Sequence, residues 1–404
     1  NIGGRGLNPA RSANFNIRQN NYDISADVLG YPESYYTPPA EALKEIQVVR
    51  GAAALQYGTQ FGGLVNFVFN DPEKDKKIKI KTRNTVGSNS LYTNFTSLSG
   101  QIKKMSYYTF MNYKVGDGFR PNSKFESTNL FSYFDIEITK NLKASCEITY
   151  LTYLAQQPGG LTDNMFYEDM FQSNRERNWF KIDWLLYNSK LSFKLNQHDN
   201  IRLNFFALDA NRFALGYRNI RVDQADALNE RDLIKGFFNN YGLETRYLNK
   251  YNIKQKKAVL LTGIKYYNSN NTSQQGPGSS EYEANFDYAN NEFPYYPNQS
   301  SYNYPNLNFA CFAENIFYIN SNLSLTPGLR YEYINTKSNG HYRAVYLNLV
   351  DQPIYDTTIY NSSKNIRGFF LLGLGVSYKK QEDYELYSNI SQNYRSVTFS
   401  DITI

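Results

Sequence analysis

The stretch LKASCEITY (residues 142–150) alternates between two kinds of side chain at every position. One face of a strand over these residues is apolar and carries Leu142, Ala144, Cys146, Ile148 and Tyr150. The other face is polar and carries Lys143, Ser145, Glu147 and Thr149. Residues 237–247 (FFNNYGLETRY) repeat the pattern, with aromatic side chains near the ends of the apolar face. Because successive side chains of a strand point to opposite faces, both stretches predict strands with one apolar and one polar face.

The predicted strands are too long for an ordinary soluble sandwich. From Lys77 onward, apolar and polar residues alternate in successive segments. Each segment spans about 10–16 residues, against ~5–6 for a typical strand. The mean hydropathy is −0.59, and the chain has no run approaching the ~18 apolar residues of a membrane helix. A barrel wall hides its apolar face at alternate positions, so average hydropathy misses it. The pattern therefore predicts an all-β transmembrane barrel. Its strands are expected near 77–86, 91–101, 104–115, 126–138, 142–154, 178–196, 200–212, 236–249, 256–269, 306–319, 322–336, 364–379 and 383–393.

The joins between these strands alternate between short and long, apart from one short join at 87–90. Short joins are expected at 101–104, 139–141, 197–200, 249–255, 320–322 and 379–383, and long joins at 116–125, 155–177, 213–235, 270–305 and 337–363. Outer-membrane barrels show this asymmetry, with tight periplasmic turns and large extracellular loops. Because such barrels close with an even number of strands, about 13 strands indicate a partial chain, truncated at both ends.

Composition excludes several other classes of protein. The chain has 404 residues, with 37 Tyr, 27 Phe, two Cys and two His. Two distant cysteines and two distant histidines, His198 and His341, offer no disulfide framework, metal-ligand spacing or nucleophile–base pair, so we expect no metal site, no catalytic residue and no enzyme. The net charge of +6 is mild for this length and does not indicate nucleic acid as a partner.

The first 75 residues have a different texture, rich in Gly and Pro, and the charged run NDPEKDKK (70–77) closes them. Within this region, QVVRGAAALQYGTQFGGLVNF (47–67) combines an Arg-Gly, a Tyr-Gly and a Gly-Gly-x-x-Asn pattern, preceded by GRGLNPARSANFNIRQN (4–20). These motifs resemble the plug domain of TonB-dependent outer-membrane receptors. RGLNP (5–9), YGTQ (57–60), PGGL (158–161) and TPGLRYE (326–332) are similar to segments of the ferric dicitrate transporter branch.

The resemblance implies an N-terminal α+β plug domain inside the barrel lumen. Residues 1–75 would form the C-terminal part of the plug, and 76–404 the N-terminal part of the barrel. A lumen wide enough for such a plug implies ~22 strands when complete. The protein would lie in the outer membrane of a Gram-negative bacterium, contacting lipid and lipopolysaccharide. It would import a ferric chelate, ferric citrate or a similar siderophore, energised by TonB and its inner-membrane complex. Iron would arrive as cargo, so no cofactor is expected.

The resemblance also suggests individual residues. Arg5 and Arg50 would anchor the plug to inward glutamates of the barrel, with Glu137, Glu147 and Glu244 as open candidates. Gln60, Arg212 and Arg231 would contact the ligand, because guanidinium and amide groups suit a carboxylate-rich chelate. Loop arginines can instead bind lipopolysaccharide phosphates. The plug stretches RQN (18–20) and GYPESYY (30–36) would either face the ligand or pack the plug against the wall.

Alternatives remain open at this point. A further family arginine would fall near YNYPNL (302–307), where this chain has only uncharged residues. This departure leaves room for a different chelate. The closest rival is a receptor for another cargo: another siderophore, haem or a glycan. A passive porin or an adhesin is a rival of a different class, although neither needs the plug motifs.

Overall fold

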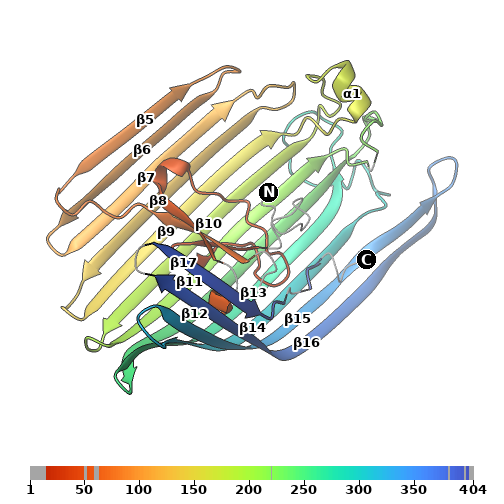
Figure 1. The fold of residues 1–404 in the computed structure, drawn as a ribbon. Helices are drawn as coiled ribbons and strands as arrows, with labels where there is room; N and C mark the ends of the chain where they lie inside the picture. Colours follow the sequence, from red (N-terminus) through yellow and green to blue (C-terminus); the bar gives the residue numbers. More distant parts are fainter. Residues whose placement is uncertain are drawn as a thin grey trace.

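The main element of the protein is one large curved sheet. The computed structural model describes residues 15–49, 52–58, 63–219, 221–380, 383–394 and 397–399. Strands β5 to β17 form a 13-stranded antiparallel sheet in which each strand pairs with its neighbours in sequence, with β5 and β17 at its edges (Figure 1). The strands are β5 (Lys79–Val86), β6 (Tyr92–Ile102), β7 (Met105–Gly116), β8 (Phe125–Glu137), β9 (Leu142–Gln156), β10 (Trp179–Lys194), β11 (Asp199–Gly216), β12 (Arg231–Ile253), β13 (Lys256–Gly278), β14 (Ser300–Tyr318), β15 (Leu323–Leu347), β16 (Pro353–Lys380) and β17 (Tyr384–Ser391).

Each predicted strand corresponds to one observed strand, and the predicted alternation of joins is confirmed except between β15 and β16. We call the end of the sheet where the β6–β7 join lies the turn end, and the opposite end, which carries the long joins and the short joins β5–β6 and β15–β16, the loop end. The loop between β9 and β10 carries the one short α-helix of the described residues, α1 (Asp163–Glu168), whose N-cap Thr162 accepts a hydrogen bond from the Met165 N–H. No helix among the described residues is long and apolar enough to cross a membrane.

The largest difference from the prediction concerns the join expected at 337–363. In the structure β15 and β16 continue through most of this segment and meet at a five-residue turn, so the hairpin projects beyond its neighbours at the loop end (Figure 1). The segment lacks an apolar alternation because both of its faces meet water there, as Tyr355 and Tyr360, which lie on opposite faces and are both exposed, show.

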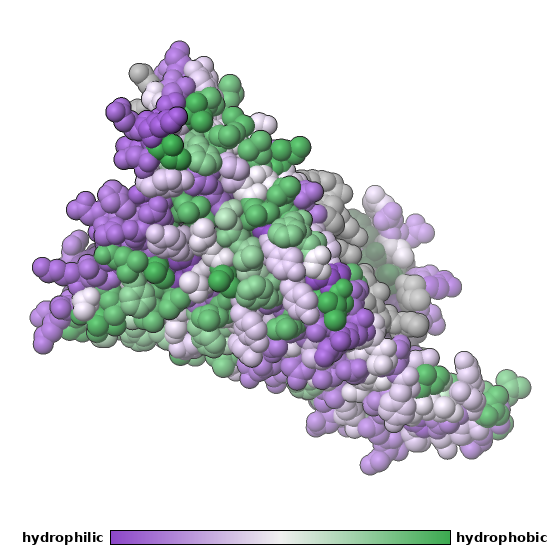
Figure 2. Space-filling model, turned by 90° about the horizontal axis from the view of Figure 1, so that it is seen from below, coloured by the Kyte–Doolittle hydropathy of each residue, from purple (hydrophilic) through white to green (hydrophobic). Residues whose placement is uncertain are grey.

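The two faces of the wall meet different surroundings, as the alternation predicts. Ile148 and Tyr150 are exposed on the outer face, whereas Glu147 and Thr149 are buried on the inner face. Cys311 is exposed and Cys146 is half-buried. Figure 2 shows hydrophobic residues spread across the face of the molecule seen there, with hydrophilic residues gathered at the projecting edges. An apolar outer face with a polar inner face is the arrangement of a wall placed in lipid.

A second, four-stranded sheet lies on the concave side of the wall (Figure 1). Its strand order is β2-β1-β4-β3, where β1 and β4 are parallel and the other pairs antiparallel. Its elements are β1 (Phe15–Gln19), β2 (Tyr22–Asp23), β3 (Leu43–Val49), β4 (Gly63–Phe69) and the 3-10 turns η2 (Ala40–Ala42) and η3 (Ala52–Tyr57). We refer to this sheet, its 3-10 turns and the segments that connect them as the plug, and to the segment 24–39 between β2 and η2 as the plug apex. The predicted domain boundary after residue 75 falls between β4 and β5 and stays a prediction.

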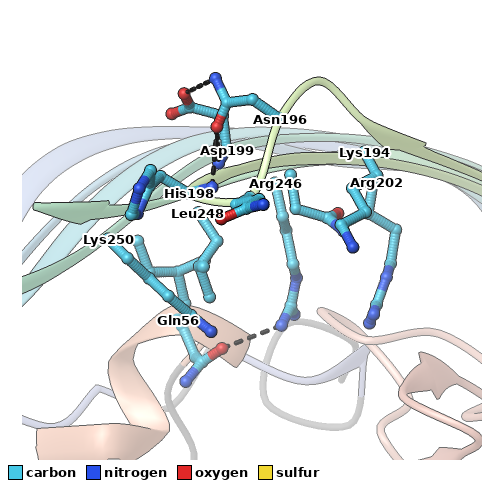
Figure 3. Close-up of a pocket in the computed structure, with 12 residues that line it drawn as sticks. Gln56, Lys194, Asn196, His198, Asp199, Arg202, Arg246, Leu248 and Lys250 are labelled. Carbon is cyan, nitrogen blue, oxygen red and sulfur yellow. Dashed lines mark hydrogen bonds between the residues drawn. The ribbon is translucent and has the colours of Figure 1, made fainter. Parts of the chain in front are cut away.

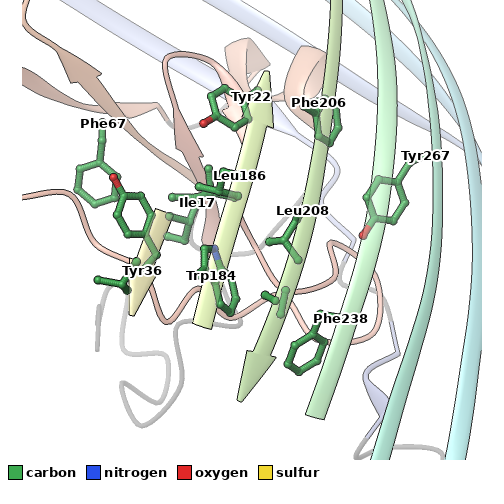
Figure 4. Close-up of a cluster of buried hydrophobic side chains, with 14 of the residues drawn as sticks. Ile17, Tyr22, Tyr36, Phe67, Trp184, Leu186, Phe206, Leu208, Phe238 and Tyr267 are labelled. Atoms are coloured by element: carbon green, nitrogen blue, oxygen red, sulfur yellow. The ribbon is translucent and has the colours of Figure 1, made fainter. Parts of the chain in front are cut away.

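The largest hydrophobic core joins the plug to the wall. Figure 4 shows plug side chains pointing at inward side chains of neighbouring strands. The labelled plug members are Ile17, Tyr22, Tyr36 and Phe67, and the wall members are Trp184, Leu186, Phe206, Leu208, Phe238 and Tyr267. Burial of each large apolar side chain contributes about 1.5–3 kcal/mol, so this shared core holds the plug inside the curve of the wall.

Candidate functional site

The plug is anchored to the wall by Arg18 of β1. The predicted anchors Arg5 and Arg50 lie outside the described residues. All five N–H donors of Arg18 are used: Nε donates to Asn16 Oδ1 (3.0 Å), Nη1 to the Asn21 carbonyl (2.8 Å) and to Glu244 Oε2 (3.4 Å), and Nη2 to the Tyr57 carbonyl (3.0 Å) and to Glu244 Oε1 (3.1 Å). The side chain is fully buried. A buried guanidinium is tolerated only with such complete pairing.

Glu244 on the inward face of β12 is the carboxylate that holds this arginine. It lies within ion-pair distance of three cations, Arg18 (3.1 Å), Arg246 (3.3 Å) and Lys265 (3.8 Å). Of the other two glutamates considered, Glu147 accepts a hydrogen bond from the plug Asn20 side chain (2.8 Å), and Glu137 is exposed. Plug and wall are thus joined by charge as well as by apolar packing.

The segment η3 is held by arginines that come from the wall. Arg330 Nη1 donates to the carbonyls of Leu55 (3.2 Å) and Gln56 (3.4 Å), and Arg246 Nη1 donates to Gln56 Oε1 (2.9 Å). Two guanidinium groups lie close to the Tyr57 ring, with Arg18 at 5.0 Å and Arg246 at 4.6 Å from its centroid. The Tyr-Gly motif of the sequence therefore serves as a contact point between plug and wall.

Asp27 fixes the plug apex to the wall. Its Oδ2 accepts hydrogen bonds from Ser269 Oγ (2.5 Å), from Asn306 Nδ2 (3.0 Å) and from Asn271 Nδ2. Its Oδ1 accepts two backbone N–H groups of its own turn, one of them from Gly30 (3.0 Å). Burial raises the pKa of Asp27 above its ordinary value, although these neutral donors oppose the shift.

A cavity of about 540 Å³ opens at the loop end, between the plug apex and the bases of two loops. We call it the loop-end cavity. Its lining combines donors and aromatic rings from the plug, from β10, β11 and from their loops: Tyr35, Gln157, Asn178, Phe180, Arg212, Ala214, Leu215, Arg218 and Asn219. A concave site with a few convergent polar groups is the usual form of a ligand pocket.

Arg212 is the central polar group of the loop-end cavity. Its Nη2 donates to the plug Tyr31 hydroxyl (3.0 Å), and its guanidinium lies 5.7 Å from the Tyr35 ring centroid. Its Nε is buried and has no hydrogen-bond partner among the described residues. A buried N–H without a partner costs about 1–3 kcal/mol, so the hydrogen-bonding capacity of this guanidinium is not fully satisfied by the described residues.

Arg231 is placed differently from Arg212, although the sequence grouped the two. It is fully buried at the start of β12. It donates to the carbonyls of Ser279 (2.7 Å), Arg177 (3.1 Å) and Glu283 (2.9 Å) and to Ser279 Oγ (2.9 Å). Four of its five donors therefore brace two loops, and it does not line the loop-end cavity. Gln60, the third predicted ligand contact, lies outside the described residues.

Other arginines brace the loop end in the same way. Arg177 pairs with Asp226 (2.5 Å) and donates to the Asn229 and Ser280 carbonyls, and Arg120 donates to the Gln172 carbonyl (2.9 Å). Sequence reasoning could assign these arginines a charge but not a partner, since the carbonyls they bind lie on distant loops. In the part of the chain that the structure describes, no group of His, Cys, Asp and Glu side chains could hold a metal ion.

Comparisons with known proteins agree with this architecture. A family model described as TonB dependent receptor-like, beta-barrel matches residues 147–404. No curated protein sequence matches the chain. Among solved structures, the chain is similar to the unliganded ferric citrate transporter FecA, with 18% identity over 99% of this chain and 57% of that one, and a TM-score of 0.77.

Two further structures share the fold. The ferric yersiniabactin uptake receptor FyuA from Yersinia pestis has 10% identity over 93% of this chain and 55% of its own, with a TM-score of 0.73. The open form of the ferric-catecholate import receptor Fiu from E. coli K12 has 11% identity over 95% of this chain and 63% of its own, with a TM-score of 0.69. The chain thus spans 55–63% of the length of these three structures. The family is one of transport receptors rather than enzymes, as the sequence predicted, and its barrels lie in the outer membrane of Gram-negative bacteria. The chain belongs to the TonB-dependent receptor family.

Proposed function

We propose that the chain forms the plug and part of the barrel of an active importer of an anionic ferric chelate, with ferric citrate as the cargo and TonB as the source of energy. The observation that carries the proposal is the position of Arg212. Its guanidinium lies in the loop-end cavity, is held over the Tyr31 and Tyr35 rings of the plug, and keeps one buried donor free.

The donors of the loop-end cavity suit a carboxylate-rich complex. Ferric citrate presents several carboxylate oxygens, and guanidinium groups bind such oxygens through paired, charge-assisted hydrogen bonds. Arg218 on the adjacent loop supplies a second guanidinium to the lining, and Gln157 supplies an amide. Iron would enter within the chelate, so the protein itself needs no cofactor.

The contacts between plug and wall fit a transport cycle in which the plug moves. The shared core and the buried Arg18–Glu244 pair hold the plug against the described wall. A bound chelate touching Arg212 would also touch the plug through Tyr35, which lines the same cavity. Force from TonB on the plug would then open a path along the wall.

Aromatic side chains in the cavity favour haem or a glycan as the second candidate cargo. The Tyr35 and Phe180 rings both line the cavity and lie 5.6 Å apart, centroid to centroid. Such rings can stack on a planar or sugar ligand. The plug packed against the wall argues against a passive porin or an adhesin, since neither function requires it.

A binding titration of the full-length protein separates these candidates. Arg212→Gln is expected to weaken ferric citrate binding by about tenfold or more, because a charge-assisted hydrogen bond is worth ~1.5–3 kcal/mol, while binding of a neutral oligosaccharide is unchanged. Arg221→Gln is the matched control, since Arg221 is exposed on the loop that follows β11 and pairs with Asp223. Binding of haem or an oligosaccharide in place of ferric citrate would contradict the cargo assignment.

Uptake by whole cells tests the coupling to TonB. Import of radiolabelled ferric citrate should require TonB and the proton-motive force, while capture at the cell surface should require neither. Uptake that continues at the same rate in cells without TonB would refute an energised importer.

A further inference from the structure

Strand β11 carries an arginine at each end of its inward-facing row. Arg212 lies at the loop end and Arg202 near the turn end, ten residues apart and therefore on the same face. At ~3.3 Å per residue the two positions are separated by about 33 Å. The row between them is buried and consists of Asn204, Phe206, Leu208 and Ala210. The wall thus offers similar cations on both sides of the segment that packs on the plug.

Arg202 lines a second cavity, of about 490 Å³, which we call the turn-end cavity (Figure 3). Its lining includes Gln56 of the plug segment η3 and four cations on the inward registers of β10, β11 and β12. These cations are Lys194, Arg202, Arg246 and Lys250. In Figure 3 the Arg202 and Arg246 side chains point from the wall toward the plug. Short turns of bacterial outer-membrane barrels face the periplasm, so this cavity lies at the periplasmic side.

The cations of the turn-end cavity are not balanced by carboxylates of its lining. Asp199 is the one acidic residue among the lining residues that the structure describes. Its carboxylate already accepts hydrogen bonds from the Tyr247 hydroxyl (2.6 Å), Asn249 (2.6 Å) and Asn196 (2.5 Å). It is turned toward Asn196 in Figure 3, away from Arg202. The residues that line the cavity therefore carry an excess of positive charge.

Two of the cations are directly opposed across neighbouring strands. Arg202 on β11 and Arg246 on β12 are register partners, and like charges in this position destabilise a sheet. Arg246 is held by Gln56 and Glu244. The Arg202 side chain has no hydrogen-bond or ion-pair partner within the described ranges and is exposed to the cavity. An anion bound between the two guanidinium groups would remove this repulsion.

We infer that the turn-end cavity is a second binding site, specific for carboxylate-rich anions, on the periplasmic side of the plug. Arg202 presents a guanidinium fork, Arg246 adds the guanidinium donors that Gln56 and Glu244 leave, and Lys194 and Lys250 add point charges at the rim. A cavity lined mainly by positive charges raises the local concentration of anions. The source of the anion rests on the proposed function: it is the cargo that has passed the plug. Arg202 is more exposed than the half-buried Arg212, so the turn-end cavity binds more weakly than the loop-end cavity and releases its anion to the periplasm.

Titration with iron-free citrate tests the site on the full-length protein. In an Arg212→Gln background, which weakens the loop-end cavity, citrate binding should remain. The further pair Arg202→Gln and Lys250→Gln should weaken this remaining binding by about tenfold or more. Arg202→Lys in place of Arg202→Gln keeps the positive charge and should restore part of the citrate binding. Lys140→Gln is the matched control, because Lys140 is exposed at another turn of the same end.

Two results of the titration would overturn the inference. One is the absence of citrate binding in the Arg212→Gln background, and the other is binding that Arg202→Gln with Lys250→Gln leaves unchanged. Thermal unfolding of each variant verifies that it is folded, and we expect Arg202→Gln with Lys250→Gln to cause no loss of stability relative to its Arg212→Gln background, because these two substitutions relieve repulsion.

Transport measurements identify the source of the anion. If the anion is cargo, Arg202→Gln with Lys250→Gln leaves surface capture of ferric citrate unchanged and slows its TonB-dependent uptake several-fold. Unchanged uptake, with citrate binding lost, would assign the site to a free periplasmic carboxylate and refute transit of cargo. If the protein does not capture ferric citrate at all, the proposed function is wrong. The titration with iron-free citrate still shows in that case whether the turn-end cavity is an anion site.

Discussion

Arg18 of the plug and Glu244 of the wall form a buried ion pair between residues 226 positions apart in the chain, with 3.1 Å between Nη2 and Oε1. The two side chains are 0% and 5% exposed. Breaking such a pair leaves an uncompensated charge in a site that water does not reach, which typically costs about 3–5 kcal/mol. The pair therefore fixes where the plug sits along the wall.

Removal of either partner should loosen the plug, but not equally. Arg18→Met leaves Glu244 paired with Arg246 and Lys265, whereas Glu244→Gln leaves three cations without their carboxylate. We expect Glu244→Gln to lie at the upper end of ~3–5 kcal/mol and Arg18→Met at the lower end. Urea unfolding followed by tryptophan fluorescence can measure the loss in the free energy of unfolding for each variant, because Trp184 is buried in the core that the plug shares with the wall.

The exposed pair Lys44–Asp71 is the matched control for that measurement. Its Nζ–Oδ2 distance is 2.7 Å, but more than half of each side chain is exposed. Since water and salt screen an exposed pair, Lys44→Met should leave the unfolding midpoint almost unchanged. An Arg18→Met midpoint no lower than that of Lys44→Met would show that the buried pair does not seat the plug.

Gly58, in the Tyr-Gly motif, is expected to tolerate no side chain. Its φ of +92° lies in the left-handed region, where a Cβ costs roughly 1–2 kcal/mol. Gly58→Ala should therefore lower the urea midpoint of the plug and increase its cleavage by protease. Gly160→Ala is the control, since the nearest atom to an added Cβ is Val222 Cγ1 at 3.6 Å. Equal effects of the two substitutions would show that the positive φ of Gly58 is not the cause of the destabilisation.

The wall could be predicted from the sequence because its signal is local. A strand such as 142–150 faces lipid on one side and the lumen on the other, so the polarity of each side chain matches the environment that it faces. The hairpin formed by β15 and β16 was underestimated, since around Tyr360 both faces meet water and the alternation disappears. Strand number and order followed from the pattern, whereas strand ends at the loop side did not.

The anchors and the ligand contacts could be predicted only in part. The sequence indicates three candidate glutamates for the anchor, and Glu244 is one of them. Its partner Arg18 lies in the stretch 18–20, for which the sequence allows either contact with the ligand or packing against the wall. Charge alone did not separate Arg212, with a free donor, from Arg231, whose donors are taken by carbonyls 48 to 54 positions away. Such differences depend on which distant backbone atoms the fold brings close.

Arg231→Ala should disorder the loop end before any ligand is present. Its loss removes hydrogen bonds to Ser279, Arg177 and Glu283, and leaves buried carbonyls without donors at a cost of about 1–3 kcal/mol each. Hydrogen exchange of the ligand-free protein should become faster in the loops 157–178 and 279–299. Unchanged exchange combined with lost chelate binding would instead indicate direct contact between Arg231 and the ligand. Arg120→Ala, which affects the first of these loops alone, serves for comparison.

The loop between β11 and β12 should loosen in acid through Asp226. Burial alone would raise the pKa of Asp226, but hydrogen bonds from the Arg177 guanidinium and the Leu228 N–H, together with the Arg177 charge, hold this pKa below its ordinary value. A carboxyl whose pKa is depressed in the folded state stabilises it above the unfolded pKa of ~3.9, and this contribution is lost as pH falls through the folded value. A spin label at the exposed position 225, in a background without Cys146 and Cys311, should therefore keep constant mobility from pH 7 to about 4 and become mobile below it. Asp226→Asn should abolish the step and make the label mobile throughout, whereas a step that persists in Asp226→Asn would assign the titration to another carboxyl.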